Sequence, residues 1–80
     1  MAKKTKFELA VIDKVKAMRI SKNLSQDDIA VIINKSRGFV GQIESPNSGS
    51  KYNLNHLNLL AKGMNCSPKD FMPEEGVGEE

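Results

Sequence analysis

Residues 25–44, SQDDIAVIINKSRGFVGQIE, decide the fold, because they predict two short helices joined by a tight turn. Ser25 suits the N-cap of the first helix, since its hydroxyl can accept from the unpaired N–H groups there and Asp28 can reach back in a capping box. Asn34 suits its end, because Asn tolerates the left-handed conformation that a tight turn requires. The apolar face of this helix consists of Ile29, Ala30 and Ile33.

The second helix of this stretch is expected to begin after an N-cap at Ser36 and to turn Val40 and Ile43 inward. Both apolar faces can then pack on one core. Two short helices joined by a turn of three or four residues form a helix-turn-helix, whose second helix fits the major groove of B-DNA.

The stretch closely resembles the Cro/C1-type (Xre-like) helix-turn-helix family, without gaps, in Leu24-Ser25-Gln26, Ile29-Ala30, a turn residue at 34, Ser36-Arg37, Val40 and Ile43-Glu44. The resemblance extends over roughly residues 11–71, because Leu59-Leu60-Ala61-Lys62, Ser67 and Phe71 are similar to the fourth and fifth helices of phage repressor domains. It implies an all-α, compact, lambda-repressor-like five-helix bundle with its helix-turn-helix in helices two and three.

The flanking segments predict three further helices. A capping box at Thr5 and Glu8 begins one that runs to about Lys22, and Asn53 begins another that ends near Asn65. A last short helix is expected in Ser67-Pro68-Lys69-Asp70, with Pro at its first position, and places Phe71 and Met72 on the core. No segment has the alternating pattern of a strand.

Eighty residues leave room for one small domain, which we place at residues 6–73, between a flexible basic N-terminus (1–5) and a disordered acidic tail (74–80). Cys66 has no second cysteine to pair with, which indicates a buried thiol and a reducing compartment. No signal peptide or membrane-spanning run is apparent, so a cytoplasmic protein is expected.

The net charge of +2 is unevenly distributed. Residues 1–22 carry seven basic against two acidic side chains, a net +5, and the last seven residues carry four Glu. Without that tail the body has a net charge of +6, which suits a polyanionic partner, although Lys-rich faces are often merely solvated. Double-stranded DNA is the partner that motif and charge together indicate.

The predicted base contacts lie on the first turn of the second helix and its next outward position: Ser36, Arg37, Gly38, Phe39 and Gln42. Arg37 can bind guanine O6 and N7 with two hydrogen bonds, and Gln42 can bind adenine N6 and N7. Alternatively, Arg37 grips only a phosphate. Phe39 either contacts a thymine methyl or belongs to the core, and Gly38 and Gly41 leave few polar groups to read bases.

The resemblance also implies two further roles. Gln26 is expected to contact the DNA backbone, and an Arg on the first helix, Arg19, to form a partly buried ion pair with Glu44. Other expected backbone contacts are Ser25, Lys35, Ser45, Asn47, Ser48 and Lys51. Lys3, Lys4 and Lys6 form either an arm along the duplex or a solvated terminus.

We predict no enzymatic activity, because no catalytic arrangement appears and His56 stands alone on its helix, without neighbours at metal-ligand spacing. No metal, cofactor or small-molecule ligand is indicated. A homodimer is expected, with Met64, Phe71 and Met72 forming either the dimer surface or part of the core. The function predicted is that of a small transcriptional regulator, repressor-like. The alternative is a protein-interaction module on the same fold, such as a toxin–antitoxin partner.

Overall fold

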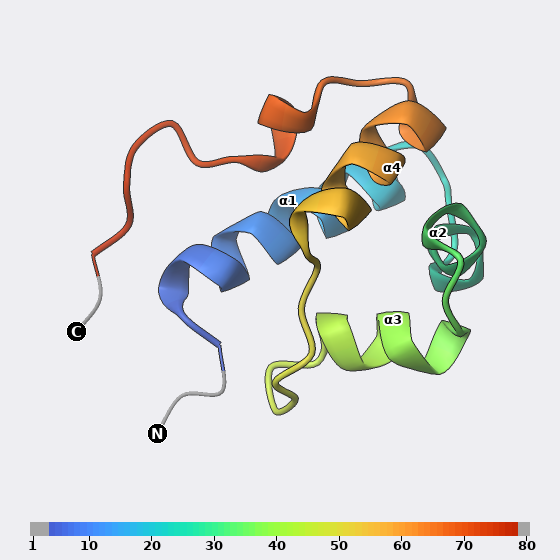
Figure 1. Cartoon of the computed structure of the whole chain (residues 1–80), viewed down its shortest axis with the longest axis horizontal. Helices are drawn as coiled ribbons and strands as arrows, with labels where there is room; N and C mark the ends of the chain where they lie inside the picture. The colour runs from blue at the N-terminus through green and yellow to red at the C-terminus, as the bar shows by residue number, and fades with distance from the viewer. Residues whose placement is uncertain (1–3, 79–80) are drawn as a thin grey trace.

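The structure, a computed structural model, describes residues 4–78 and places them in four α-helices and one short 3-10 helix, with no strand in that range. The elements are α1 (Lys6–Ser21), α2 (Gln26–Ile33), α3 (Arg37–Glu44), α4 (Leu54–Met64) and the 3-10 helix η1 (Pro68–Phe71). Figure 1 shows α3 along one side of the molecule, η1 on the opposite side, and α2 seen nearly end-on. The all-α prediction is confirmed.

The predicted fifth helix is a single 3-10 turn rather than an α-helix. Ser67 caps it and Pro68 occupies its first position, as expected. Its backbone bonds span three residues: the Asp70 N–H donates to the Ser67 carbonyl at 2.9 Å, and the Met72 N–H to the Lys69 carbonyl at 3.1 Å. A four-residue element is too short for a ladder of α-helical bonds, so the tighter pattern forms.

The helix starts lie at the predicted caps. Capping boxes form at Thr5, Ser25, Asn53 and Ser67, and Ser36 accepts the Phe39 N–H at 3.1 Å. Asn34 and Asn65 end α2 and α4 in the left-handed conformation, with φ of 58° and 57°. Asn23 adopts the same conformation in the α1–α2 turn, which the sequence pattern had not indicated.

One apolar core joins the helices. Its fully buried side chains come from every element and are Val15, Ile29, Val40, Ile43, Leu60 and Phe71. Met64 and Phe71 are buried, at 2% and 0% exposure, so these two close the core and do not form a dimer surface. Met72 and Cys66 are only half-buried against the same core.

Gly63 of α4 packs directly against the Ile32 side chain of α2. A Cβ atom there would lie 2.8 Å from the Ile32 Cγ2, which no real contact tolerates, so the two helices can pack this closely only because Gly63 has no side chain.

Of the N-terminal segment 1–5, which is expected to be flexible, the structure describes Lys4 and Thr5. Thr5 caps α1, and Lys4 is buried, because its ammonium group binds the far end of α3. The expectations for Lys3 and for the end of the acidic tail concern residues outside the described range of 4–78. No helix within that range is long and apolar enough to cross a membrane.

Candidate nucleic-acid interface

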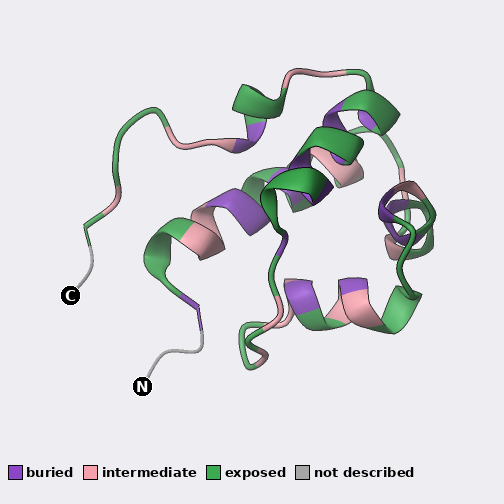
Figure 2. Cartoon of the chain, viewed as in Figure 1, coloured by how far each residue is buried: buried purple, intermediate pink, exposed green. Residues whose placement is uncertain are grey.

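Helix α3 has one buried and one exposed side. Val40 and Ile43 have no exposed surface, and Figure 2 shows that the buried positions of α3 face the body of the protein. The predicted base contacts that the structure leaves exposed are Ser36, Arg37, Gly38 and Gln42. Residues 38 and 42, four apart, share one helix face, so these positions form a continuous surface with Arg37 beside it.

The guanidinium group of Arg37 is unpaired in the described part of the chain. Within residues 4–78 it has no hydrogen-bond or ion-pair partner, although Arg carries five N–H donors in a planar fork. Neighbouring Gly38 adds no bulk, and a Cβ built there would find only the Ser36 Oγ within 4 Å, at 3.9 Å. The N-terminal end of α3 is therefore open to a bound ligand.

Phe39 is neither fully exposed, as a contact to a thymine methyl would need, nor fully buried in the core. Its ring is half-buried and packs edge-on against the His56 ring of α4, with centroids 6.1 Å apart and planes at 70°. The Lys35 ammonium lies 5.9 Å from the centroid of the Phe39 ring, within the range of a cation–π contact. Phe39 thus anchors the N-terminal half of α3 to α4, and part of its ring remains accessible.

His56 completes the capping box of α4. Its Nδ1 accepts the Asn53 N–H at 3.1 Å, and its own N–H donates to the Asn53 Oδ1 at 2.7 Å. Burial, with a smaller effect from the Lys35 charge, lowers the pKa of His56 below its ordinary value. A neutral imidazole is the form that can accept at Nδ1, so geometry and pKa agree.

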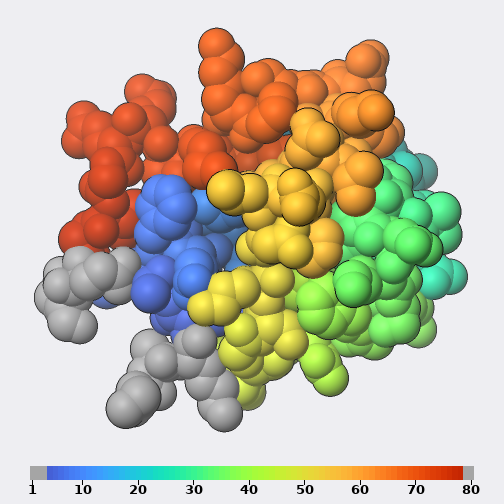
Figure 3. Space-filling view, viewed as in Figure 1, coloured from blue at the N-terminus to red at the C-terminus, as the bar shows by residue number. Residues whose placement is uncertain are grey.

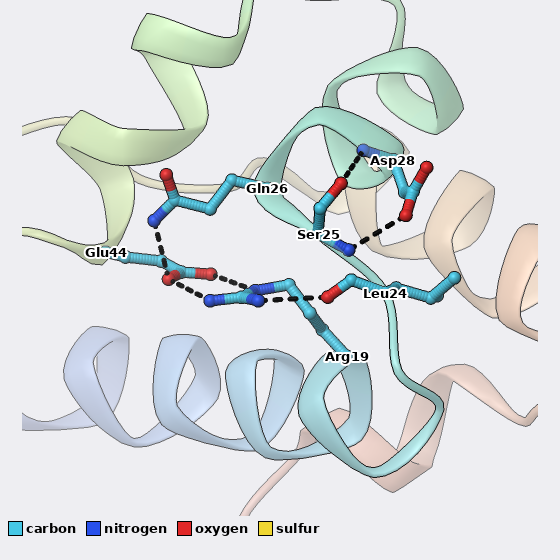
Figure 4. Close-up of polar contacts among 6 residues, drawn as sticks. All are labelled: Arg19, Leu24, Ser25, Gln26, Asp28 and Glu44. Atoms are coloured by element: carbon cyan, nitrogen blue, oxygen red, sulfur yellow. Dashed lines mark hydrogen bonds and ion pairs between the residues drawn. The ribbon is translucent and has the colours of Figure 1, made fainter.

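The C-terminal end of α3 contains the Arg19–Glu44 ion pair that the family resemblance implies (Figure 4). Arg19 binds the carboxylate through two parallel hydrogen bonds, from Nε to Oε2 at 2.9 Å and from Nη2 to Oε1 at 2.8 Å. Its Nη1 donates to the Leu24 carbonyl at 3.0 Å, just before α2. The pair therefore joins α1, the α1–α2 turn and α3.

Glu44 is charged although its side chain is only 5% exposed. Burial by itself would raise the pKa of Glu44, but the hydrogen bonds from Arg19 and Gln26 outweigh it and hold the pKa below its ordinary value. The Arg19–Glu44 ion pair is bidentate and nearly shielded from solvent. Removing one partner of such a pair leaves the other charge buried without a counter-charge.

Gln26 faces inward, which sequence reasoning missed. Its Nε2 donates to the Glu44 Oε1 at 3.0 Å, linking the start of α2 to the end of α3 (Figure 4). This bond uses one of the two N–H donors of the side-chain amide. The second N–H remains for the DNA-backbone contact expected of Gln26.

The loop after α3 supports Gln42. The Ser50 hydroxyl donates to the Gln42 Oε1 at 3.2 Å, a contact that no sequence pattern indicated. The hydroxyls of Ser45 and Ser48 accept from backbone N–H groups two residues later, so their first role is to shape the loop. In the space-filling view this loop (yellow) lies between α1 (blue) and α3 (green) (Figure 3).

The other residues predicted to contact the DNA backbone differ in their exposure and in their hydrogen-bond or ion-pair partners. Asn47 and Lys35 are exposed, and the Ser25 oxygen accepts the Asp28 N–H at 3.0 Å. Lys51 pairs with Glu8 at 2.7 Å, with the Lys51 side chain 45% exposed. Because exposed ion pairs contribute only about 0–1 kcal/mol, Lys51 can exchange Glu8 for a phosphate at little cost.

Lys4 is the functional candidate that sequence reasoning placed differently. It is 4% exposed, and its Nζ donates to the main-chain carbonyls of Gln42 at 3.3 Å, of Ile43, and of Ser45 at 2.6 Å. The partners are about 40 residues away along the chain, and nothing in local spacing identifies them.

Comparison of the chain with family models, with curated proteins and with solved structures gave no match. The resemblance of residues 24–44 to the Cro/C1-type family therefore stays a sequence-based prediction.

Proposed function

We propose that the protein binds double-stranded DNA sequence-specifically as a small, repressor-like transcriptional regulator of the Cro/C1-type family with a lambda-repressor-like fold. In this proposal α2 and α3 form the helix-turn-helix, and α3 lies in the major groove. The observation that carries it is the division of α3 into a side fixed by the core and the Arg19–Glu44 pair and a side on which the Arg37 donors are unpaired. A rigid helix presenting free donors is what groove recognition needs.

Arg37 and Gln42 are the proposed base-reading pair. The fork of Arg37 matches guanine O6 and N7, and the amide of Gln42 matches adenine N6 and N7. The hydrogen bond from Ser50 does not prevent this, because the Gln42 carbonyl oxygen has two lone pairs and its NH₂ group has no partner within residues 4–78. Ser50 instead holds the amide in place.

Phosphate contacts complete the proposed interface. The Ser25 hydroxyl accepts a backbone N–H and keeps its own hydrogen to donate, and the first N–H groups of α2 have no partners inside the helix. On the other side of α3 the exposed candidates are Lys35, Asn47 and Lys51. Two copies are proposed to bind half-sites about one helical turn apart, because one recognition helix contacts too few base pairs.

Selection from a random duplex library tests the proposal. We expect a pseudo-palindromic winning sequence, and an affinity whose logarithm falls linearly with log salt at a slope of about −0.9 per phosphate contacted. The matched control is the Arg37→Ala/Gln42→Ala double variant, in which both substituted side chains are exposed, so the fold is retained and enrichment is lost. No enriched sequence and no binding at low salt would contradict the proposal and favour the protein-interaction alternative.

A further inference from the structure

We propose that Lys4 is a positioning residue for α3: it closes the C-terminal end of this helix from within the protein and does not itself contact DNA. The part of this inference that concerns DNA rests on the proposed function, whereas the part that concerns the order of α3 does not.

The C-terminal end of α3 lacks the cap that the other short helices have. Helices α2 and α4 end at Asn34 and Asn65 in the left-handed conformation, each with two cap hydrogen bonds. Helix α3 ends at Ser45 in an extended conformation, with φ −82° and ψ 128°, one cap bond, and no basic residue in its last turn. The next residue, Pro46, has no N–H to donate. The Gln42 carbonyl already accepts the Ser45 N–H at 3.2 Å, and the Ser45 carbonyl accepts the Ser48 N–H at 3.4 Å. The Ile43 carbonyl between them has no backbone donor within residues 4–78 and needs a donor from elsewhere.

Lys4 supplies that donor. An ammonium group has three N–H donors, and the three carbonyls that Lys4 binds are those of Gln42, Ile43 and Ser45, at the end where the helix dipole is negative. The match in number and charge makes Lys4 a side-chain cap for a helix that is almost 40 residues away in sequence.

Two consequences follow for the proposed DNA-binding surface. First, Lys4 is 4% exposed with its donors engaged, so it is not a free phosphate ligand. Second, Gln42 is held at two points, its main-chain carbonyl by Lys4 and its side-chain amide by Ser50. Lys4 thereby fixes the residue proposed to read adenine while leaving Arg37, at the other end of α3, untouched.

The test compares the Lys4→Met variant, which keeps a long unbranched side chain and removes the donors, with two variants of equal charge change. Lys69→Met alters an exposed lysine of η1, on the side of the molecule opposite α3 (Figure 1). Lys35→Met alters an exposed lysine at the proposed phosphate surface. Amide hydrogen exchange of the free proteins, and DNA binding to the selected sequence over a salt series, are measured for all three.

For Lys4→Met we expect about tenfold faster exchange of the Ile43, Glu44 and Ser45 amides, the loss that hydrogen bonds to a charged donor imply, with α2 and α4 unchanged. The affinity of Lys4→Met for the selected DNA should fall. Its discrimination between bases should weaken at the base pair read by Gln42 and stay unchanged at the base pair read by Arg37. The slope of log affinity against log salt should be the same in Lys4→Met as in Lys69→Met. In Lys35→Met the magnitude of this slope should fall by about 0.9, the contribution of one phosphate contact.

Three results would overturn the inference. A salt slope reduced by about 0.9 in Lys4→Met would make Lys4 a phosphate ligand. If hydrogen exchange in Lys4→Met were accelerated equally at all amides, Lys4 would stabilise the whole fold rather than α3. If exchange were unchanged, Lys4 would have no role in holding α3. If the wild-type protein binds no duplex DNA while the exchange result holds, the proposed function fails and the closing of α3 by Lys4 stands.

Discussion

The two ends of α3 differ in how they are held. At its C-terminal end, Glu44 is bound by Arg19 through two hydrogen bonds, and Lys4 binds the last carbonyls. At its N-terminal end the contacts are the cap of Ser36 and the packing of the Phe39 ring on His56. There Arg37 has no partner in residues 4–78, and a Cβ at Gly38 would have only the Ser36 Oγ within 4 Å. The difference teaches that α3 is fixed by the protein at one end and keeps the polar groups of Arg37 unpaired at the other, the arrangement that the proposed DNA binding requires.

Breaking the fixed end should have the largest effect. Glu44→Ala strands the guanidinium of Arg19, whose side chain is 13% exposed, and we expect a loss of about 3–5 kcal/mol in the free energy of unfolding, measured by urea denaturation. Arg19→Ala should lose as much. The control is Lys51→Ala, which breaks the more exposed pair with Glu8, leaves Glu8 in the capping box of α1, and should cost about 0–1 kcal/mol. Equal losses for Glu44→Ala and Lys51→Ala would refute the comparison.

Changing the open end should alter recognition with little effect on stability. Arg37→Ala is expected to reduce discrimination at one base pair by about 1–3 kcal/mol, because a bidentate contact is lost. Lys35→Ala should weaken binding to all sequences alike. Both are measured on single-base variants of the selected duplex. The unfolding curve of Arg37→Ala should match the wild type, and Lys35→Ala should lose no more than about 1 kcal/mol, the contribution of its cation–π contact with Phe39. A uniform loss for Arg37→Ala would mean that Arg37 grips only a phosphate.

The contact between the open end and α4 should make stability depend on pH. Because the pKa of folded His56 is lowered, the unfolded chain takes up a proton first as pH falls below about 6.5, so stability is complete above that pH and declines below it. One such group gives a slope of at most about 1.4 kcal/mol per pH unit. Denaturation between pH 7 and 5 measures this, above the range in which Glu44, with its lowered pKa, titrates.

His56→Gln is the control for this pH dependence, since Gln keeps an acceptor for the capping box but does not titrate. Its stability should be flat between pH 7 and 5. A wild-type profile that is equally flat would exclude His56 as the cause.

The smallest effect is expected at the glycines. Gly38→Ala should raise the free energy of unfolding by up to about 1 kcal/mol, because the added methyl would have only the Ser36 Oγ within 4 Å, at an ordinary contact distance of 3.9 Å. It should lower DNA affinity if α3 approaches bases there. Gly41→Ala is the matched variant: its methyl would lie 3.6 Å from the Gln26 Oε1, an ordinary contact, so stability rises and affinity stays. Equal affinities of the two variants would place Gly38 outside the interface.

Sequence by itself determined where the helices begin and end. The caps at Thr5, Ser25, Ser36 and Asn53, and the left-handed Asn34, were predictable because a cap joins a side chain to a backbone group only a few residues away. The inward faces of α2 and α3 were equally predictable, since burial follows the helical period. Resemblance to a family, not spacing, indicated the pair of Arg19 with Glu44.

Only the tertiary structure decided which polar groups are occupied. Gln26 donates a hydrogen bond to Glu44, and Ser50 donates one to Gln42. Lys4 donates to the carbonyls at the end of α3. No sequence pattern marks any of these partners. A lysine near a terminus looks solvated in sequence, because exposure depends on which segments fold beside it. The physical reason is that caps and helical periods are local interactions, whereas the partner of a long polar side chain is set by how the helices pack.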